Sequence, residues 1–345
     1  MPLSAAMPLP SMLSPNGTVI SNTPVSAHCI GVMAFPFPRE VTGDGSKGQA
    51  GTLRPAANRP QLPTTFLQVD LIQMKRGKMK GMSNFSGKTA LITGASSGMG
   101  MDYARQLCAA GANLILTARR VDRLEALKQE LAAECAAKGV CVDIHVFACD
   151  LVNEASRESL IARIADAGLK VDILINNAGL GLQAPYLTQQ WDDLHGMMQL
   201  DMNALSHLTH HYAADMKDRG EGYILLVASV AGHMAIPGYA AYSACKYYVR
   251  ALGYALNGEL APDGIRVTVV SPGATETAFF EVAGHERNWI ACFMTGKSEH
   301  VVCAALKGLR RGTREVVPGT LNWLATFYSR LLPYGMMRRI MEVIF

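Results

Sequence analysis

The sequence predicts an α/β protein: a single domain built on a doubly wound parallel sheet of six or seven strands, with helices on both faces. From Lys88 onward, short runs rich in β-branched residues alternate with stretches of helical periodicity. This alternation is typical of strand–helix–strand units, whose parallel strands are covered on both faces. A glycine-rich turn stands between the first expected strand and the first expected helix, where a doubly wound sheet binds its ligand.

The elements follow one another in a regular order. The first strand reads Thr-Ala-Leu-Ile-Thr, and the helix after it stops at Gly111, a usual end signal. The same alternation then repeats along the chain. Strands are expected at residues 89–93, 114–118, 143–148, 171–175, 223–228, 266–271 and 315–317. Helices are expected at residues 99–110, 122–138, 156–167, 190–217 and 239–259.

Length and composition agree with one large globular unit. The chain has 345 residues, of which 49% are hydrophobic and 17% charged. These values exclude a small disulfide scaffold, a coiled coil and a chain disordered throughout. The 8 cysteines stand singly, without Cys-x-x-Cys pairs or the Cys/His spacing of a metal site. We therefore expect reduced thiols and no metal.

Three segments of the chain differ in amino-acid composition. Residues 1–81 hold ten of the 16 prolines, and eight Lys and Arg against three acids; they are expected to be a disordered or non-native leader. Residues 82–318 form the expected domain, and residues 319–345 an apolar C-terminal extension. The net charge of +4 lies in the leader, because the rest of the chain holds 24 basic and 25 acidic residues. No nucleic-acid partner is predicted.

The glycine-rich turn, Thr-Gly-Ala-Ser-Ser-Gly-Met-Gly at residues 93–100, has the form of a dinucleotide fingerprint. Glycines let the chain turn tightly and let backbone N–H groups approach a pyrophosphate, which then faces a helix N-terminus. The residues expected to contact the cofactor here are Gly94, Ser96, Ser97, Gly98, Met99 and Gly100.

The end of the second strand indicates which dinucleotide binds. An NAD site would place an acid there, but this strand is followed by Arg119 and Arg120, whose guanidinium groups suit a 2′-phosphate. NADP(H) is therefore favoured over NAD, with Arg119 the stronger candidate of the two. The alternative is that both arginines are solvated residues at the start of a helix.

Three side chains further along form a candidate catalytic group. Ser229 stands at a strand end, and Tyr242 and Lys246 are four residues apart on the next helix, so they share one face. A free phenol has a pKa near 10, which a neighbouring ammonium and an oxidised nicotinamide would lower. Tyr242 is then a usable general acid or base, although Tyr-x-x-x-Lys by itself is often a helix-surface pair.

Together these motifs resemble the short-chain dehydrogenase/reductase family over about residues 86–320. That family's Thr-Gly-x-x-x-Gly-x-Gly turn matches residues 93–100, its Asn-Asn-Ala-Gly strand end matches residues 176–179, and its Pro-Gly motif matches Pro272-Gly273. Its serine, thirteen residues before the tyrosine, matches Ser229. The resemblance implies a Rossmann-type fold.

The resemblance also implies a role for each matched residue. Tyr242 would exchange a proton with the substrate oxygen, which Ser229 would orient. Lys246 would hold the nicotinamide ribose and lower the pKa of the tyrosine, and Asn203 would support a water relay. The remaining cofactor contacts implied by the family are Asp150, Asn176, Ala178, Gly179, Pro272, Gly273 and Thr277.

Apolar residues indicate the substrate. Those of the segment after Pro272-Gly273, a lid in this family, are Phe279, Phe280, Val282, Trp289, Ile290, Phe293 and Met294. The opposite wall is expected to hold four apolar residues, Leu180, Leu182, Met234 and Ile236, together with Tyr186 and His233. An apolar cleft favours a lipophilic carbonyl or alcohol. The alternative is that the lid residues simply close the core.

The extension at residues 319–345 combines apolar residues with arginines, and Pro333 and Gly335 divide it into two short helices. A peripheral membrane contact, a cover over the cleft and a subunit contact all remain open for it. The sequence predicts a cytoplasmic homo-oligomer, with membrane association as the alternative.

The predicted function is an NADP(H)-dependent oxidoreductase acting on a carbonyl/hydroxyl pair of a small molecule. The alternatives are an NAD-linked alcohol dehydrogenase and a non-catalytic NADP(H)-binding regulator.

Overall fold

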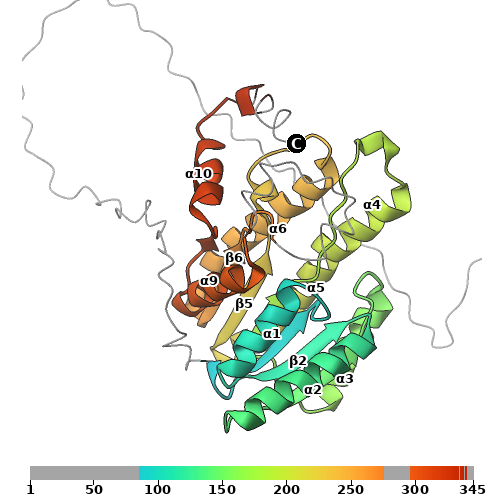
Figure 1. The fold of residues 1–345 in the computed structure, drawn as a ribbon, viewed down its shortest axis with the longest axis vertical. Helices are drawn as coiled ribbons and strands as arrows, with labels where there is room; N and C mark the ends of the chain where they lie inside the picture. The colour runs from blue at the N-terminus through green and yellow to red at the C-terminus, as the bar shows by residue number, and fades with distance from the viewer. Residues whose placement is uncertain (1–84, 276–295, 334, 338, 340–345) are drawn as a thin grey trace, which may run out of the picture. The chain divides into compact units, whose positions relative to one another are not determined.

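The computed structural model describes residues 85–275, 296–333, 335–337 and 339. Within them, seven strands form one parallel sheet in the order β3-β2-β1-β4-β5-β6-β7 (Figure 1). The chain first builds outward from β1 to β3 and then returns to the other side of β1 to build β4 to β7. This is the Rossmann-type, doubly wound sheet that the sequence predicts, and its switch point lies between β1 and β4.

Each expected strand is present, with ends that differ by at most two residues. The strands are β1 Thr89–Thr93, β2 Asn113–Ala118, β3 Ile144–Ala148, β4 Ile173–Asn176, β5 Gly222–Val227, β6 Ile265–Val270 and β7 Glu315–Val316. All residues of β4 and β5 are buried, since helices cover both faces of the sheet. Continuous apolar runs, rather than alternating ones, are the consequence.

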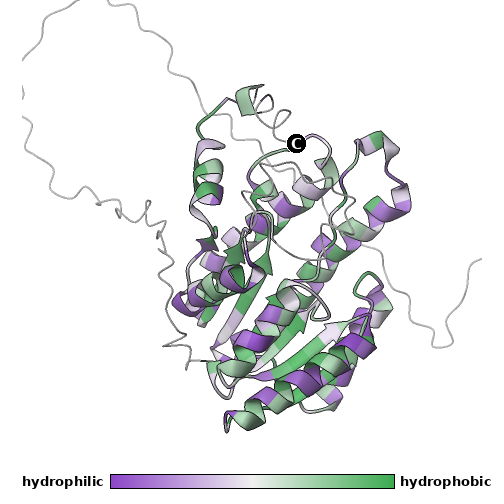
Figure 2. Ribbon diagram, in the orientation of Figure 1, coloured by the Kyte–Doolittle hydropathy of each residue, from purple (hydrophilic) through white to green (hydrophobic). Residues whose placement is uncertain are grey.

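Helices form a layer on each face of the sheet. Residues of α1 Met99–Ala109, α2 Val121–Ala137 and α9 Ser298–Arg311 pack into one apolar core. Residues of α3 Glu154–Asp166, α5 Leu205–Arg219 and α6 Ala240–Glu259 pack into the other. Figure 2 shows largely hydrophobic strands between helices of mixed hydropathy, as expected of helices with one face on a sheet.

The expected helix at residues 190–217 is interrupted. It consists of α4 Trp191–Met198, a π-helical turn, η4 Gln199–Ala204, and α5. The wider π turn changes which side chains face inward: Asp201 is buried and Asn203 is exposed.

The helix α9 was not expected from the sequence. Its apolar residues recur with helical spacing, at Val301, Val302, Ala305, Leu306 and Leu309, and all five are buried. After α9 the chain forms β7 and then α10 Thr320–Tyr328. Within the described ranges, no helix has the length and apolarity needed to cross a bilayer.

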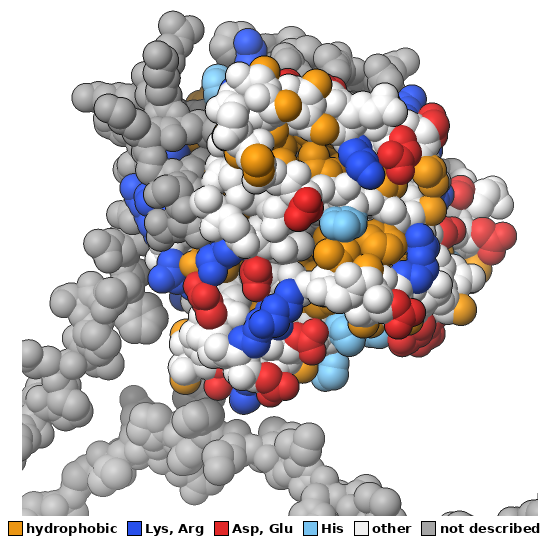
Figure 3. Space-filling model, turned by 90° about the horizontal axis from the view of Figure 1, so that it is seen from below, with side chains coloured by type: hydrophobic (Ala, Val, Ile, Leu, Met, Phe, Trp, Pro, Cys, Tyr) orange, Lys and Arg blue, Asp and Glu red, His pale blue; other side chains and the backbone are white. Residues whose placement is uncertain are grey.

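Charged side chains of both signs are interspersed on the face of the molecule shown in Figure 3, around small apolar patches. This distribution fits the near balance of basic and acidic residues after residue 81. An even mixture of charge is what a solvated globular surface carries.

Candidate active site

A cavity of about 440 Å³ opens at the carboxyl ends of the central strands, where doubly wound sheets bind ligands. At one end it is bordered by the glycine-rich turn and the residues after β2, and at the other by Ser229, Tyr242 and Lys246. The candidate residues that line it are Gly94, Ser96, Ser97, Gly98, Met99, Arg119, Arg120, Asp150, Ala178, Gly179, Ser229, Tyr242, Lys246, Pro272 and Gly273.

The turn between β1 and α1 is held in shape by its own backbone and by β4. Gly94 has a φ of 67°, and a Cβ on Gly100 would lie 2.2 Å from the Gly94 carbonyl oxygen. Gly100 therefore packs closely against the backbone of Gly94 and does not line the cavity. Thr93 Oγ1 accepts hydrogen bonds from the N–H groups of Asn177 and Ala178, each at 2.9 Å, and so joins this turn to the end of β4.

The two arginines lie at the cavity edge and are both exposed. One guanidinium nitrogen of Arg120 donates to Ser96 Oγ over 3.2 Å, so Arg120 is the arginine that contacts the glycine-rich turn. The sequence favours Arg119, for which the structure shows only a place on the lining. A positive charge beside this glycine-rich turn would suit a phosphate group.

Asn176 does not lie in the cavity, contrary to the sequence-based expectation. It is buried, and its Nδ2 donates to Thr209 Oγ1 on α5 over 2.8 Å. Its neighbour Asn177 lines the cavity instead and donates to the Thr93 carbonyl. Successive side chains at a strand end point to opposite sides, and this alternation could have separated the two asparagines.

Tyr242 and Lys246 lie on the inner face of α6 and are 8% and 5% exposed. The ammonium of Lys246 lies 5.5 Å from the centre of the Tyr242 ring. Ser229, which follows β5, makes a side-chain hydrogen bond with Tyr242, and its Oγ also accepts from the Ala231 N–H at 3.2 Å. The structure therefore brings together Ser229, Tyr242 and Lys246, but not Asn203, the fourth residue that the family resemblance implies.

Burial raises the pKa of Tyr242, and the opposing effects of Lys246 and the Ser229 hydrogen bond do not cancel this increase. Lys246 therefore acts in the expected direction, but burial outweighs its effect, and the expected effect of an oxidised nicotinamide stays a prediction. A charged group taken out of water loses hydration, which disfavours the phenolate more than one nearby ammonium favours it.

Asn203 is not among the residues that line the cavity, and Asp201, rather than Asn203, contacts Lys246; the water-relay role of Asn203 stays a prediction. Asn203 is exposed, and its Nδ2 donates to Gln199 Oε1 over 2.9 Å. Asp201, two residues earlier, is 1% exposed, and its Oδ2 lies 2.8 Å from Lys246 Nζ. The π turn turns Asp201 inward, and sequence periodicity alone could not have revealed that turn.

The apolar end of the cavity matches part of the expected substrate wall. Leu180 and Ile236 line the cavity, and Leu182 and Met234 belong to the same apolar cluster as Tyr242. Tyr186 is 51% exposed, so it is not part of this wall. Thr277 and the expected lid residues, from Phe279 to Met294, lie outside the described residues.

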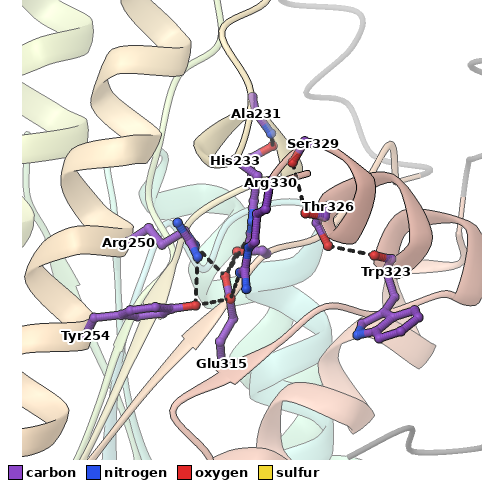
Figure 4. A network of polar contacts seen from close by, with 11 residues as sticks. Ala231, His233, Arg250, Tyr254, Glu315, Trp323, Thr326, Ser329 and Arg330 are labelled. Atoms are coloured by element: carbon purple, nitrogen blue, oxygen red, sulfur yellow. Dashed lines mark hydrogen bonds and ion pairs between the residues drawn. The ribbon is translucent and has the colours of Figure 1, made fainter. Parts of the chain in front are cut away.

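His233 does not line the cavity, and its ring points toward Glu315 (Figure 4). Its Nε2 lies 2.9 Å from Glu315 Oε1, which also accepts from Arg250 Nε at 3.1 Å and from Ser271 Oγ at 2.8 Å. Burial would raise the pKa of Glu315, but hydrogen bonds from His233 and nearby positive charge lower it to about 2. This carboxylate joins the loop after Ser229 to α6, β6 and β7.

The C-terminal extension packs on the substrate side. Arg330 lies 3.6 Å from Glu315, and Ala325, Leu332 and Met337 pack with the apolar cluster that contains Tyr242. The outward residues of the extension are exposed: Leu321, Leu324, Phe327, Tyr328, Leu331 and Met336. Of the three roles left open for this extension, a cover beside the cleft is the one these contacts favour. A membrane contact stays a prediction.

Fold and cavity together define a nicotinamide-dinucleotide-binding α/β oxidoreductase. Residues 88–288 match the short chain dehydrogenase family, and the chain belongs to that family. A sulfoacetaldehyde reductase from Chromohalobacter salexigens is 38% identical over 238 residues, 68% of this chain and 87% of that protein.

Two solved structures are also similar to this chain. A short-chain dehydrogenase from Sphingobium yanoikuyae in complex with NADPH has a TM-score of 0.62 and 31% identity, and covers 72% of this chain and 95% of its own. The bulky-bulky ketone specific alcohol dehydrogenase from Comamonas testosteroni has a TM-score of 0.59 and 30% identity, and covers 72% and 93%.

Proposed function

We propose that the protein is an NADP(H)-dependent reductase of bulky, lipophilic ketones or aldehydes, with Tyr242 as the proton donor. The observation that carries the proposal is one continuous cavity, with Arg119 and Arg120 beside the glycine-rich turn at one end and Ser229 and Tyr242 at the other. This arrangement can hold a phosphorylated dinucleotide along its length and a carbonyl group at its apolar end.

The residues at the cofactor end fit the dinucleotide. The backbone of residues 94–99 and the side chains of Ser96 and Ser97 would hold the pyrophosphate, and the two arginines the 2′-phosphate. Lys246 would hold the nicotinamide ribose, as the family resemblance implies. NADPH supplies the hydride when bound, and the protein provides orientation and electrostatics.

The residues at the substrate end handle the proton. Ser229 would donate a hydrogen bond to the carbonyl oxygen and hold it beside Tyr242, whose hydroxyl proton passes to that oxygen as the alcohol forms. Burial and apolar neighbours at this end exclude water, which favours lipophilic substrates. The similar proteins include one named for a small polar aldehyde and one named for bulky ketones, and the wall formed by Leu180, Val230 and Ile236 favours the latter.

A panel of ketones and aldehydes, graded by chain length and ring size, tests the substrate class. With NADPH we expect kcat/KM to rise as apolar groups are added on both sides of the carbonyl, by about tenfold for each two buried methylene groups. Faster turnover of small charged aldehydes, such as sulfoacetaldehyde, would contradict the lipophilic assignment. Absence of turnover across the panel, with tight NADPH binding, would favour a non-catalytic regulator.

Cofactor choice is tested on Arg119→Ala and Arg120→Ala, with Arg123→Ala as the matched control. Arg123 is exposed on α2, which begins directly after Arg120, and does not line the cavity. We expect each of the first two changes to weaken NADPH binding by about tenfold and to leave NADH binding nearly unchanged, since a charged hydrogen bond contributes about 1.5 kcal/mol or more. An equal loss for both cofactors would contradict the 2′-phosphate assignment.

A further inference from the structure

The ion pair between Asp201 and Lys246 is a buried feature of the site that the proposed reaction does not yet use. Asp201 Oδ2 lies 2.8 Å from Lys246 Nζ, and the two side chains are 0% and 6% exposed. Its other oxygen, Oδ1, accepts from the Leu180 N–H at 2.8 Å. The carboxylate therefore touches both the cofactor-holding lysine and the backbone of the apolar wall.

The surrounding backbone accommodates this pair. The π turn η4 brings Asp201 inward, and a Cβ on Gly179 would lie 3.2 Å from both Asp201 Oδ1 and Lys246 Nζ. A side chain at position 179 would therefore crowd both partners. Lys246 Nζ also donates to the Val227 carbonyl over 3.3 Å. Three segments of the chain thus hold the pair in one geometry.

We propose that Asp201 is a positioning residue that balances the charge of Lys246, so that Tyr242 stays protonated and the enzyme is set for carbonyl reduction at neutral pH. The inference rests on the proposed role of Tyr242 as proton donor. With the carboxylate present, a neutral phenol beside the ion pair leaves the buried site without net charge. Without it, the same phenol would stand beside one uncompensated buried ammonium, and loss of the phenol proton would relieve that charge.

The ionisable groups that act on Tyr242 come from two elements. Lys246 and Cys245 lie on α6, and Asp201 on η4, while Ser229 adds a hydrogen bond. Burial raises the pKa of Cys245 to about 11, so this thiol carries no charge near neutral pH. The pKa of Asp201 is raised, because burial outweighs the opposing effects of Lys246 and the Leu180 N–H, but the 2.8 Å contact with Lys246 Nζ has the geometry of an ion pair. Lys246 and Asp201 are therefore the charges that decide the state of the phenol.

The test measures the pKa of Tyr242 in the full chain without any ligand. The titration is monitored by NMR on protein labelled with 13C at the tyrosine Cζ. The Tyr242 signal is assigned as the one lost in Tyr242→Phe, because the Tyr239 ring lies only 6.0 Å away. In Asp201→Asn we expect the dissociation constant of the Tyr242 phenol to rise by about tenfold or more. Asparagine keeps the acceptor for the Leu180 N–H while removing the charge.

The matched control is Asp218→Asn, which removes a carboxylate from the exposed side of α5 and should leave the Tyr242 titration unchanged. A second readout is the pH profile of NADP⁺-dependent oxidation of the alcohol that gives the highest rate in an alcohol panel. Oxidation needs the phenolate, so its rising limb should move to lower pH in Asp201→Asn. If that variant folds poorly by thermal unfolding, Asp201→Ser removes the same charge with a smaller side chain.

An unchanged or higher Tyr242 pKa in folded Asp201→Asn would overturn the inference and leave Asp201 as a packing residue. This outcome is distinct from failure of the proposed function, because the NMR titration needs neither cofactor nor substrate. The proposed function would fail through retained turnover in Tyr242→Phe, whatever the titration of Asp201→Asn shows.

Discussion

The cavity has a proposed cofactor half, around the glycine-rich turn, and a proposed substrate half, around Ser229 and Tyr242. The two halves are built differently. The cofactor half joins β1, β2 and β4 through backbone contacts within a regular sheet, such as the bond from the Ala95 N–H to the Thr117 carbonyl at 3.2 Å. The substrate half depends on the π turn η4, on the side chains around Glu315 and on the C-terminal extension. In the proposed function, regular backbone would position the dinucleotide, whereas irregular segments would position the groups that react beside it.

This difference predicts where a substitution acts. A change in the cofactor half should weaken binding of the dinucleotide and spare the chemistry of a bound substrate. A change in the substrate half should alter turnover or stability and spare the affinity for NADPH. Four substitutions test this separation, in order of decreasing expected effect.

Tyr242→Phe removes the proposed proton donor of the substrate half and should have the largest effect. We expect turnover to fall by about 10³-fold, the usual contribution of a positioned general acid, and the Kd for NADPH to stay within about twofold. Steady-state kinetics and fluorescence titration with NADPH measure the two quantities. Tyr248→Phe is the control, since the Tyr248 hydroxyl lies on the exposed side of α6 and bonds Ser206 of α5. A comparable loss of NADPH binding in Tyr242→Phe would break the separation of the halves.

Glu315→Gln tests the stability of the substrate half. The pKa of Glu315 is lowered to about 2 from 4.5, so its carboxylate contributes on the order of 3 kcal/mol to the free energy of unfolding. Because the folded pKa is the lower one, this contribution is complete above about pH 4.5 and disappears as the pH falls toward 2.

Urea unfolding of both proteins between pH 7 and about pH 3 measures this difference. We expect the gap between wild type and Glu315→Gln to be largest at neutral pH and to shrink in acid. Glu134→Gln is the control, because Glu134 forms an exposed pair with Lys138 and should change stability by less than about 0.5 kcal/mol. A gap that stays constant with pH would show that the carboxylate charge does not stabilise this network.

Gly100→Ala tests the cofactor half. A Cβ at this position would lie 2.2 Å from the Gly94 carbonyl oxygen, so the turn must distort. We expect NADPH to bind about tenfold more weakly and the free energy of unfolding to fall by about 1–3 kcal/mol. Gly196→Ala on α4 is the control, because nothing lies within 4 Å of its Cβ, and alanine should slightly stabilise the helix. Unchanged NADPH affinity in Gly100→Ala would contradict the role of this turn.

The same difference explains what the sequence could predict. The strands and the glycine-rich turn were predicted because their signals are local: apolar runs, glycines and their spacing. The pairing of Asp201 with Lys246 could not be predicted, since it depends on one extra residue in a helical turn, and Asp-Met-Asn at residues 201–203 offers two polar candidates. The contacts of His233 with Glu315 join residues 82 positions apart, which no local pattern reports.

Asn203→Ala has the smallest expected effect and sharpens the comparison within the substrate half itself. Its Nδ2 bonds Gln199 Oε1 on the exposed side of the helix, an i,i+4 contact that contributes a few tenths of a kcal/mol. The higher helix propensity of alanine offsets this loss of free energy by about the same amount. We therefore expect kcat/KM and the Kd for NADPH to stay within about twofold of wild type, and the Tm within about one degree. Asp201→Ala, in contrast, should destabilise the protein by about 3 kcal/mol, because it leaves Lys246 buried and unpaired. A large loss of turnover in folded Asn203→Ala would instead restore to Asn203 the water-relay role that the family resemblance implies, and would remove the reason to assign that part of the site to Asp201.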